Sequence, residues 1–487
     1  MKNTLKGILI LLVSITLFGA CSDSFFDEKP SDRITPDQHY KSMIEAELSC
    51  LTPLSILRDV VPQMVFSCDL LSDMTTVTDN ADMNVQNINN HVLSADNPYL
   101  DPSVLYQVII NANESLMHMD SIKSLDQDIT DIDLSIFKGN LIGVRSWAYF
   151  MISRLYGEAA YIKDNLSSLP DEALTYIPRG AMMDTLINHL LPYLDIDYAD
   201  FGNISMYNKA LIGEIYLEKQ DYTNAALYLQ MAIEGFENGV QKYKVTTSYN
   251  KDSWKSIFVS AAYQSTEVMI AVPFNYLENQ PNPIELWYNY DYEYLAKPTN
   301  YIVNLFEKET TVRDKEGDEY RGLGVSYDTI AGNYTVNKYN LYEGDPLSSD
   351  IILYRAADIH LLLAEALNRT GNSEIALQLL SEGYHDLPGW SKNAGIRGRA
   401  YLSTITLADV PEGANVVDYV EDLIVKERAE ELAFEGKRWF DLMRVARRRG
   451  TGYLADKVAA KYSDGNLANK VREQLKDEKN WYLPFEK

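Results

Sequence analysis

The stretch from Glu427 to Arg444 reads E-R-A-E-E-L-A-F-E-G-K-R-W-F-D-L-M-R, and its spacing makes it the most informative part of the chain. In helical register, Glu427 and Glu431 share a face with apolar residues, which predicts that both carboxylates are buried. A buried carboxylate without a partner is costly, so both groups need cations close by. The residues of this face are Val420, Leu423, Ile424, Glu427, Glu431 and Phe434.

The pattern restarts after Gly436 with a second apolar face, accompanied by charges at the spacing where opposite signs meet on a helix. An arginine can bind a carboxylate through two parallel hydrogen bonds. We therefore interpret this segment as an ionic clamp between two helices. Its apolar residues are Trp439, Phe440, Met443 and Ala446, and its charged residues are Arg438, Asp441 and Arg444.

An alternative interpretation makes Glu427, Glu431 and Asp441 an acid/base set, because paired carboxylates also perform general acid and base catalysis. The rival function is then a surface glycosidase. The abundant arginines favour the clamp, since they would hold the carboxylates ionised and would not keep one of them protonated.

Three segments in the same order resemble motifs of the SusD/RagB family, surface lipoproteins that capture nutrients for outer-membrane transporters in Bacteroidetes. Val144–Tyr161 contains R-S-W-A-Y-F and L-Y-G-E-A, Tyr354–Arg369 contains A-E-A-L-N, and Glu427–Arg444 is the third. The resemblance implies a mostly α fold. A SusD-like helical-repeat scaffold with tetratricopeptide-type helix pairs would carry an irregular, loop-rich ligand-binding part.

Two segments, Tyr207–Phe236 and Tyr354–Gly383, show the pattern of a helix-turn-helix repeat, with small alanines that let paired helices approach closely. We expect one SusD-like domain over residues 21–487, because helical repeats can extend as one unit. Its helical scaffold is expected at about 36–160, 184–240 and 350–450, and its loop-rich segment at about 243–350.

The amino terminus has the pattern of a lipoprotein signal peptide over residues 1–20. Lys2 and Lys6 precede an apolar run, Ile8–Phe18, that is too short to span a bilayer. Small residues stand directly before Cys21, which predicts lipidation of this cysteine after cleavage. An ordinary signal peptide is the alternative. The acidic residues that follow resemble, in this family's hosts, a signal for the outer face of the outer membrane.

The composition indicates a large acidic globular body. The chain has 487 residues, 46% of them hydrophobic, and a formal net charge of −26. Such a body repels phosphate backbones, which argues against nucleic acid, and it fits anionic lipid poorly. Membrane contact is therefore expected through the lipid anchor and a protein partner. Cys50 and Cys68 could form a disulfide or be separately buried thiols, and their spacing does not decide between the two.

A polar stretch from Ser72 to Leu100 has little periodicity, and loops of this length are usually functional or disordered. In SusD-like proteins the corresponding stretch contributes to the ligand face. The resemblance makes Asp73, Asn97 and Tyr99 candidate ligand-binding residues, although Asp and Asn are also ordinary turn formers.

Aromatic residues concentrate between residues 243 and 350, including Trp287 and the run Y-N-Y-D-Y-E-Y that contains Tyr290 and Tyr292. If this run is extended, its tyrosines share one face. Sugar rings stack on aromatic side chains while nearby polar groups bind the hydroxyls, so this region is a candidate glycan site. Packing beneath the loop is the alternative. Trp390, in the loop L-P-G-W-S-K, is a further candidate.

Catalytic and metal signatures are missing from the sequence. The histidines are scattered without zinc-ligand spacing, and no nucleophile elbow, phosphate-binding loop or dinucleotide fingerprint is present. The pairs Asp131/Asp133 and Asp195/Asp197 lack the spacing of a calcium loop. We therefore expect no cofactor and no bound metal.

These observations together predict a non-enzymatic, lipid-anchored receptor on the outer membrane that faces the exterior. By resemblance, it would bind an oligosaccharide and deliver it to a SusC-like TonB-dependent transporter. Peptide capture, as in RagB, is the alternative within binding proteins, and the sequence does not name the ligand.

Overall fold

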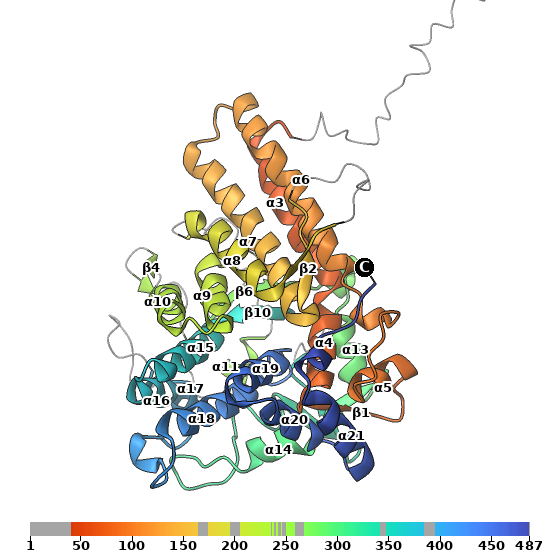
Figure 1. The fold of residues 1–487 in the computed structure, drawn as a ribbon, viewed down its shortest axis with the longest axis vertical. Helices are drawn as coiled ribbons and strands as arrows, with labels where there is room; N and C mark the ends of the chain where they lie inside the picture. The colour runs from red at the N-terminus through yellow and green to blue at the C-terminus, as the bar shows by residue number, and fades with distance from the viewer. Residues whose placement is uncertain are drawn as a thin grey trace, which may run out of the picture.

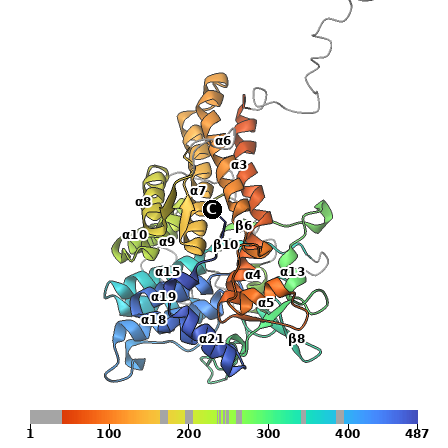
Figure 2. The same ribbon diagram turned by 45° about the vertical axis from the view of Figure 1, so that its right-hand side comes forward.

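The computed structural model describes residues 40–163, 174–194, 205–234, 250–258, 267–340, 347–383 and 395–486, with short pieces between 236 and 245. The fold is mostly α-helical, as the resemblance implied. Figures 1 and 2 show three long helices that project from one end of a broader helical body. These helices are α3 (Met43–Ile56), α6 (Ser103–Leu125) and α7 (Asp131–Tyr156).

Local sequence signals set the ends of α7, the longest of the three. Thr130 and Asp133 form a capping box at its start, and Gly157 adopts φ +79° at its end. Trp147 is 3% exposed, so its indole ring lies in the core. The chain then forms the hairpin β2 (Glu158–Ala160) and β3 (Tyr176–Pro178), followed by α8 (Arg179–Leu190).

Two helix pairs follow the predicted repeats, α9 (Asn208–Glu218) with α10 (Tyr222–Ile233) and α15 (Ala356–Arg369) with α16 (Ser373–Ser381). A Cβ at Gly213 would lie 2.7 Å from Leu229, so glycine allows α9 and α10 to approach closely. The pairs stack on each other through α10 and α15. Strand β10 (Ile351–Arg355) leads into α15 and pairs antiparallel with β6 (Val268–Val272).

The carboxyl-terminal helices contain the two predicted faces of the clamp. Helix α18 spans Val416–Glu431 and α19 spans Arg438–Arg449, and Figure 1 shows them beside the repeat helices. Phe434 is buried, but it lies in the turn after α18 with φ +63°, so its predicted place on the helix face was wrong. Gly436 has φ +70°, and a Cβ there would lie 2.9 Å from the Val65 backbone. The helices α20 (Gly452–Ala459) and α21 (Gly465–Leu475) follow.

The polar stretch from Ser72 to Leu100 and the expected loop-rich segment at about 243–350 both contain more regular structure than their sequences indicated. The polar stretch after Ser72 forms a strand and two short helices, and short strands pair it with the tyrosine-rich region. The polar stretch follows α4 (Val61–Leu71) and contains β1 (Thr75–Val77), α5 (Met83–Asn89) and η3 (Pro98–Leu100). The later segment contains α13 (Pro283–Tyr288), β7 (Ala296–Pro298), α14 (Asn300–Glu307), β8 (Tyr327–Ile330) and β9 (Asn333–Val336). Strand β1 pairs with β7, and β8 pairs with β9.

Short elements complete the described chain. They are η2 (Leu57–Asp59), η4 (Leu191–Tyr193), β4 (Phe236–Glu237), β5 (Val240–Gln241), α11 (Lys251–Lys255), η6 (Tyr276–Glu278), α17 (Ile396–Arg399), η7 (Leu407–Asp409) and η8 (Glu478–Trp481).

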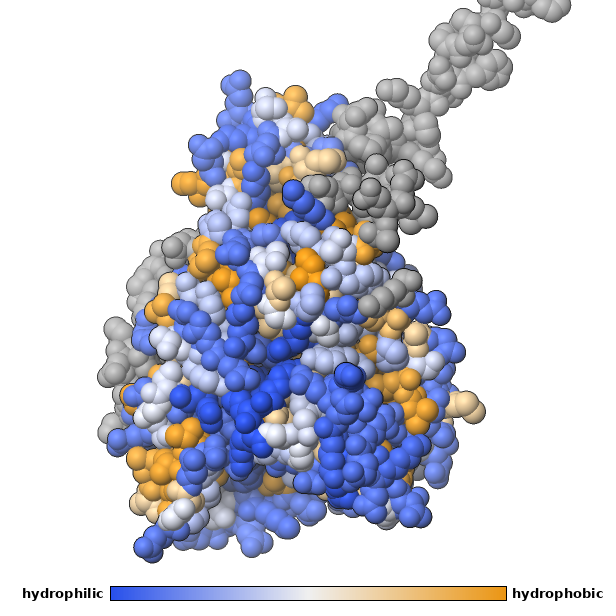
Figure 3. All heavy atoms as spheres, in the orientation of Figure 1, coloured by the Kyte–Doolittle hydropathy of each residue, from blue (hydrophilic) through white to orange (hydrophobic). Residues whose placement is uncertain are grey.

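One large hydrophobic core runs through the helical elements and the strands, and the face in Figure 3 is mostly hydrophilic, with separate apolar patches. Cys50 and Cys68 are both buried and free, which settles the open alternative in favour of separate thiols. Among the described residues, no helix is long and apolar enough to cross a membrane.

Candidate functional site

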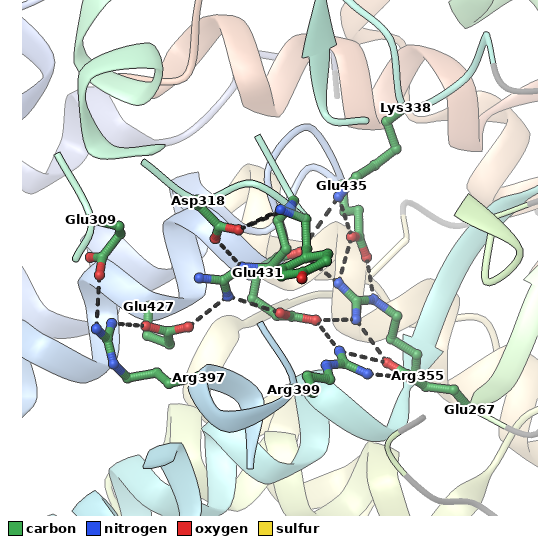
Figure 4. A network of polar contacts seen from close by, with 12 residues as sticks. Glu267, Glu309, Asp318, Lys338, Arg355, Arg397, Arg399, Glu427, Glu431 and Glu435 are labelled. Carbon is green, nitrogen blue, oxygen red and sulfur yellow. Dashed lines mark hydrogen bonds and ion pairs between the residues drawn. The ribbon is translucent and has the colours of Figure 1, made fainter. Parts of the chain in front are cut away.

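Glu431 lies at the centre of a buried cluster of arginines and carboxylates, shown in Figure 4. Its carboxylate accepts hydrogen bonds from Arg355 at 2.6 Å and from Arg321 at 3.1 Å, and Arg399 donates to it as well. Burial alone would raise the pKa of Glu431. The guanidinium groups of Arg399, Arg355 and Arg321 outweigh burial and lower this pKa to about 2. The carboxylate is therefore ionised at neutral pH.

Glu427 is held in the same way, one turn earlier on α18. Arg321 donates to one of its oxygens at 2.6 Å, and Arg397 donates to the other at 2.8 Å. Arg397 also donates to Glu309 at 2.8 Å, so the cluster continues from one carboxylate to the next. Glu427 is 1% exposed and Glu431 is fully buried, so substrate does not reach either group.

The predicted ionic clamp exists, but most of its partners differ from the predicted ones. Arg428 links the two helices by donating to Asp441 at 2.9 Å, and Arg448 and Arg449 link them near the other end by donating to Glu421 and Asp422. Arg438 instead makes two 2.8 Å hydrogen bonds to Asp73, and Arg444 makes hydrogen bonds of 2.8 and 2.7 Å to the carboxylate of Glu365. Arg438 and Arg444 therefore bind acids from other elements, while arginines outside α18 and α19 satisfy Glu427 and Glu431.

Asp73 consequently lies inside the protein, not on a ligand face. It is 1% exposed, and the charge of Arg438 overcomes the effect of burial and lowers its pKa. This placement gives Asp73 a structural role in attaching the start of the polar stretch to α19. Its candidacy as a ligand contact rested on the resemblance, and the geometry offers it no access to solvent.

Two further acids that the sequence did not single out have raised pKa values. Burial raises the pKa of Glu430 well above its usual value, and Glu427 and Glu309 add to the shift. The closest cation, Lys426, is 3.8 Å away. Burial also raises the pKa of Asp69 to about 8, although Asp69 accepts a 3.0 Å hydrogen bond from Tyr288. No sequence signal separates these acids from their paired neighbours.

The structure brings Tyr99 and Trp287 together, as a ligand site would require. Their rings meet edge to face at 5.7 Å, and both pack against Phe66. Trp287 is only 9% exposed, so most of its ring belongs to the core, whereas Tyr99 is half-buried. Asn97 is buried as the cap of η3, where it accepts from the Tyr99 amide and donates to the Asn84 carbonyl.

The tyrosine run is not an extended strand, so the predicted common face was wrong. Its first residue, Tyr288, ends α13 and is buried, and Tyr294 has φ +50°. Tyr290 packs edge to face on Tyr294 at 5.2 Å. Tyr292 is 45% exposed and is the tyrosine of this run that solvent reaches most.

A polar hollow of about 600 Å³ opens beside the exposed edge of Trp287. Arg58 lines it, and the Nε of this arginine is buried without a hydrogen-bond partner among the described residues. Sequence reasoning missed the hollow, because its lining residues come from two segments, 55–63 and 274–287, that are distant along the chain. Its lining residues are Ser55, Ile56, Arg58, Asp59, Pro62, Gln63, Phe274, Asn279, Gln280, Pro281, Pro283 and Trp287.

The remaining candidate residues concern lipidation, ligand binding and metal binding. Cys21 and Trp390 lie outside the described residues. A search of the described chain finds no group of three or more His, Cys, Asp or Glu residues that could hold a metal ion. Asp131 pairs with Lys123, and Asp133 caps α7, so both acids have structural partners.

The fold and this site define a class, a helical-repeat protein with an internally braced ionic core and an aromatic, polar hollow at its surface. Comparisons with known proteins agree. The model of the SusD family matches residues 287–486. The SusD-like protein P38 of Formosa agariphila is 23% identical over 90% of each chain, and the SusD-like protein P2 of the same organism is 22% identical over the same shares.

Solved structures show the same fold. A SusD superfamily protein from Bacteroides vulgatus superposes with a TM-score of 0.69 at 17% identity, covering 91% of this chain and 96% of that one. A laminarin-binding SusD-like protein superposes with a TM-score of 0.62 at 18% identity, covering 88% and 96%. The SusD family model matches the carboxyl-terminal part of the chain, residues 287–486, and the chain is similar to SusD-like proteins over 90% of its length.

Proposed function

We propose that this chain is a cell-surface glycan-binding lipoprotein that delivers an oligosaccharide to a SusC-like TonB-dependent outer-membrane transporter. The observation that carries the proposal is the hollow beside Trp287, where an aromatic edge, amides and the Arg58 guanidinium line one open space. Aromatic rings suit the C–H faces of sugars, and amide and guanidinium groups suit their hydroxyls. The laminarin-binding relative with the same fold supports a glycan as ligand.

The proposed role is binding without catalysis. Glu427 and Glu431, the carboxylates that a glycosidase would need, are buried and bound by arginines. A general acid must hold a proton near the working pH, whereas the pKa of Glu431 is lowered to about 2. Turnover of any glycan by the purified protein, abolished by Glu431→Gln with the fold intact, would refute this part of the proposal.

A glycan and peptide array with the full-length protein in mild detergent tests the ligand class. We expect binding to one or more oligosaccharides, and Arg58→Ala should weaken it because that variant removes the unpaired donor of the hollow. Arg313→Ala, at an exposed arginine outside the hollow, is the matched control. Binding of peptides alone would favour the RagB-like alternative, and equal glycan affinity of Arg58→Ala and wild type would remove the hollow as the site.

The anchor and the partner need a separate experiment in cells. Cys21→Ala should abolish labelling by a palmitate analogue and release the protein from outer membranes, because one cysteine carries the whole proposed anchor. Crosslinking of the wild type in outer membranes should capture a TonB-dependent barrel. Repeated recovery of the crosslinked protein without such a barrel would contradict the proposed delivery role.

A further inference from the structure

A second opening lies at the end of the molecule away from the tip formed by α3 and α6 (Figure 1). We name it the tyrosine cleft. Its volume is about 690 Å³, and β1, β7, the start of α14, the β8–β9 turn and the connection between α20 and α21 form its walls. It shares no lining residue with the hollow beside Trp287.

The walls of the tyrosine cleft carry groups that suit a sugar. Three half-buried tyrosines, Tyr301, Tyr334 and Tyr462, offer aromatic surface. Two of them are held by polar contacts, since Tyr301 accepts from Arg438 at 3.1 Å and Tyr462 donates to the Asn89 carbonyl. Amide and hydroxyl groups stand between the rings, from Thr76, Asn89, Asn90, Asn300 and Asn333.

One of these amides has an unused acceptor. Asn89 is 2% exposed, and its Oδ1 has no hydrogen-bond partner among the described residues, while its Nδ2 donates to Asn90 at 2.9 Å. A buried polar atom without a partner costs free energy unless a water or ligand satisfies it. A sugar hydroxyl is a donor of the right kind.

The charge of the cleft differs from that of the whole chain. Lys297 and Lys461 line it, whereas the chain has a formal net charge of −26. The one acid in the lining, Asp464, caps α21 by accepting from the Asn466 amide at 2.8 Å. No carboxylate in the described chain forms an ion pair with either lysine. Lys461 donates to the carbonyls of Leu70 and Ser72, and burial lowers its pKa to about 7, so a ligand carboxylate beside it would favour its charged form.

We propose that the tyrosine cleft binds a carboxylate-bearing unit of an oligosaccharide, with the sugar on the tyrosines and the carboxylate on Lys297 and Lys461. This inference rests on the proposed glycan-binding function and narrows its ligand to acidic saccharides. Rings and amides alone would suit a neutral sugar. The two lysines without an acidic partner supply the preference for a negative charge.

Calorimetry with tetragalacturonate, a sulfated carrageenan tetrasaccharide and neutral maltotetraose tests the inference on the full-length protein in detergent. Tetragalacturonate should bind, and Lys297→Met should weaken its binding about tenfold, as expected for loss of a hydrogen bond to a charged group. Lys461→Met should weaken it similarly, although this variant also frees two backbone carbonyls. Lys297→Met therefore provides the test that does not depend on those carbonyls.

The matched control is Lys470→Met, at an exposed lysine of α21 outside the cleft, and it should bind tetragalacturonate as the wild type does. Unchanged affinity of Lys297→Met would overturn the inference. Binding of the sulfated sugar alone, lost in Lys297→Met, would overturn the assignment of a carboxylate.

Arg58→Ala separates the inference from the proposed function. If this variant loses every glycan while Lys297→Met binds as the wild type does, the cleft is not a site and the proposed function stands. If no glycan of any class binds the wild type, the proposed function fails and the inference fails with it. Loss of acidic sugar in Lys297→Met, with retention in Arg58→Ala, supports two separate sites.

Discussion

The ionic core around Glu431 and the hollow beside Trp287 use the same kinds of side chain with opposite results. In the core, arginines bind each of the carboxylates Glu427 and Glu431 from two or more directions. In the hollow, Arg58 lines the open space, and its buried Nε has no hydrogen-bond partner among the described residues. Saturated charges hold elements together, whereas unsaturated polar groups remain available to a ligand. The most conspicuous charges of this sequence therefore belong to its stability.

The largest expected effect is acid unfolding, which would test the core as a whole. Arginines lower the pKa values of Glu218, Glu365 and Glu431 to about 2 against the opposing effect of burial. Carboxylates with lowered folded-state pKa values stabilise the protein fully above the unfolded value near 4.5, and this contribution is lost as pH falls toward 2. Urea unfolding followed between pH 7 and pH 2 should show the free energy of unfolding falling steeply below about pH 4.5. A flat profile would contradict a core held by these acids.

Removal of one charge from the core should also lower the free energy of unfolding strongly. Glu431→Gln leaves Arg355, Arg399 and Arg321 with one negative charge fewer between them, and breaking a buried ion pair costs about 3–5 kcal/mol. Urea unfolding at pH 7 measures the change. Glu412→Gln, at an exposed glutamate, should leave the free energy of unfolding within about 0.5 kcal/mol. A loss below about 1 kcal/mol for Glu431→Gln would mean that the core pairs contribute little.

A similar acid-to-amide substitution at Asp69 should lower the free energy of unfolding much less. Burial raises the pKa of Asp69 to about 8, so this group is mostly protonated at pH 7 and resembles an amide in charge. We expect Asp69→Asn to change the free energy of unfolding by about 1 kcal/mol or less at pH 6. Because the folded-state pKa is raised, the free energy of unfolding of the wild type falls as pH rises from about 4 to about 8. The variant lacks this loss, so its stability relative to the wild type should increase over the same range. Equal pH profiles for the two proteins would show that Asp69 is ionised.

The smallest effect is expected at the hollow. Arg58→Ala removes a side chain whose Nε makes no internal hydrogen bond, so the free energy of unfolding should stay within about 0.5 kcal/mol of the wild type. Thermal and urea unfolding of Arg58→Ala and the control Arg313→Ala measure this. A decrease of more than about 2 kcal/mol in the free energy of unfolding would show that Arg58 stabilises the fold, as the arginines of the core do.

Much of the fold could be predicted from the sequence, because periodicity and turn residues act over short distances. The repeat pairs and the burial of Glu427 and Glu431 follow from the spacing of apolar residues along the helices. The strand β1 and the helix α5 were missed, since their polar residues gain structure from β7 and from local caps. The alternation of the tyrosine run indicated a strand, but the end of α13 and a positive φ at Tyr294 interrupt it.

The candidate site was predicted only in part. Tyr99 and Trp287 lie close together and their role in binding stays a prediction, whereas Asp73 and Asn97 are internal. Arg58 and Gln63 were not predicted, because the hollow forms between two segments, 55–63 and 274–287, that only the folded chain brings together. Lipidation of Cys21 and the role of Trp390 stay predictions.

The sequence by itself determined the helical repeats and the need of the buried acids for cations, since spacing and desolvation depend only on neighbouring residues. Only the tertiary structure decided which arginines satisfy which acids, because Arg321 lies 110 positions from Glu431 and no local pattern relates them. The tertiary structure also decided which polar groups remain unpaired at the surface. A group is available to a ligand when the folded chain has brought no partner to it.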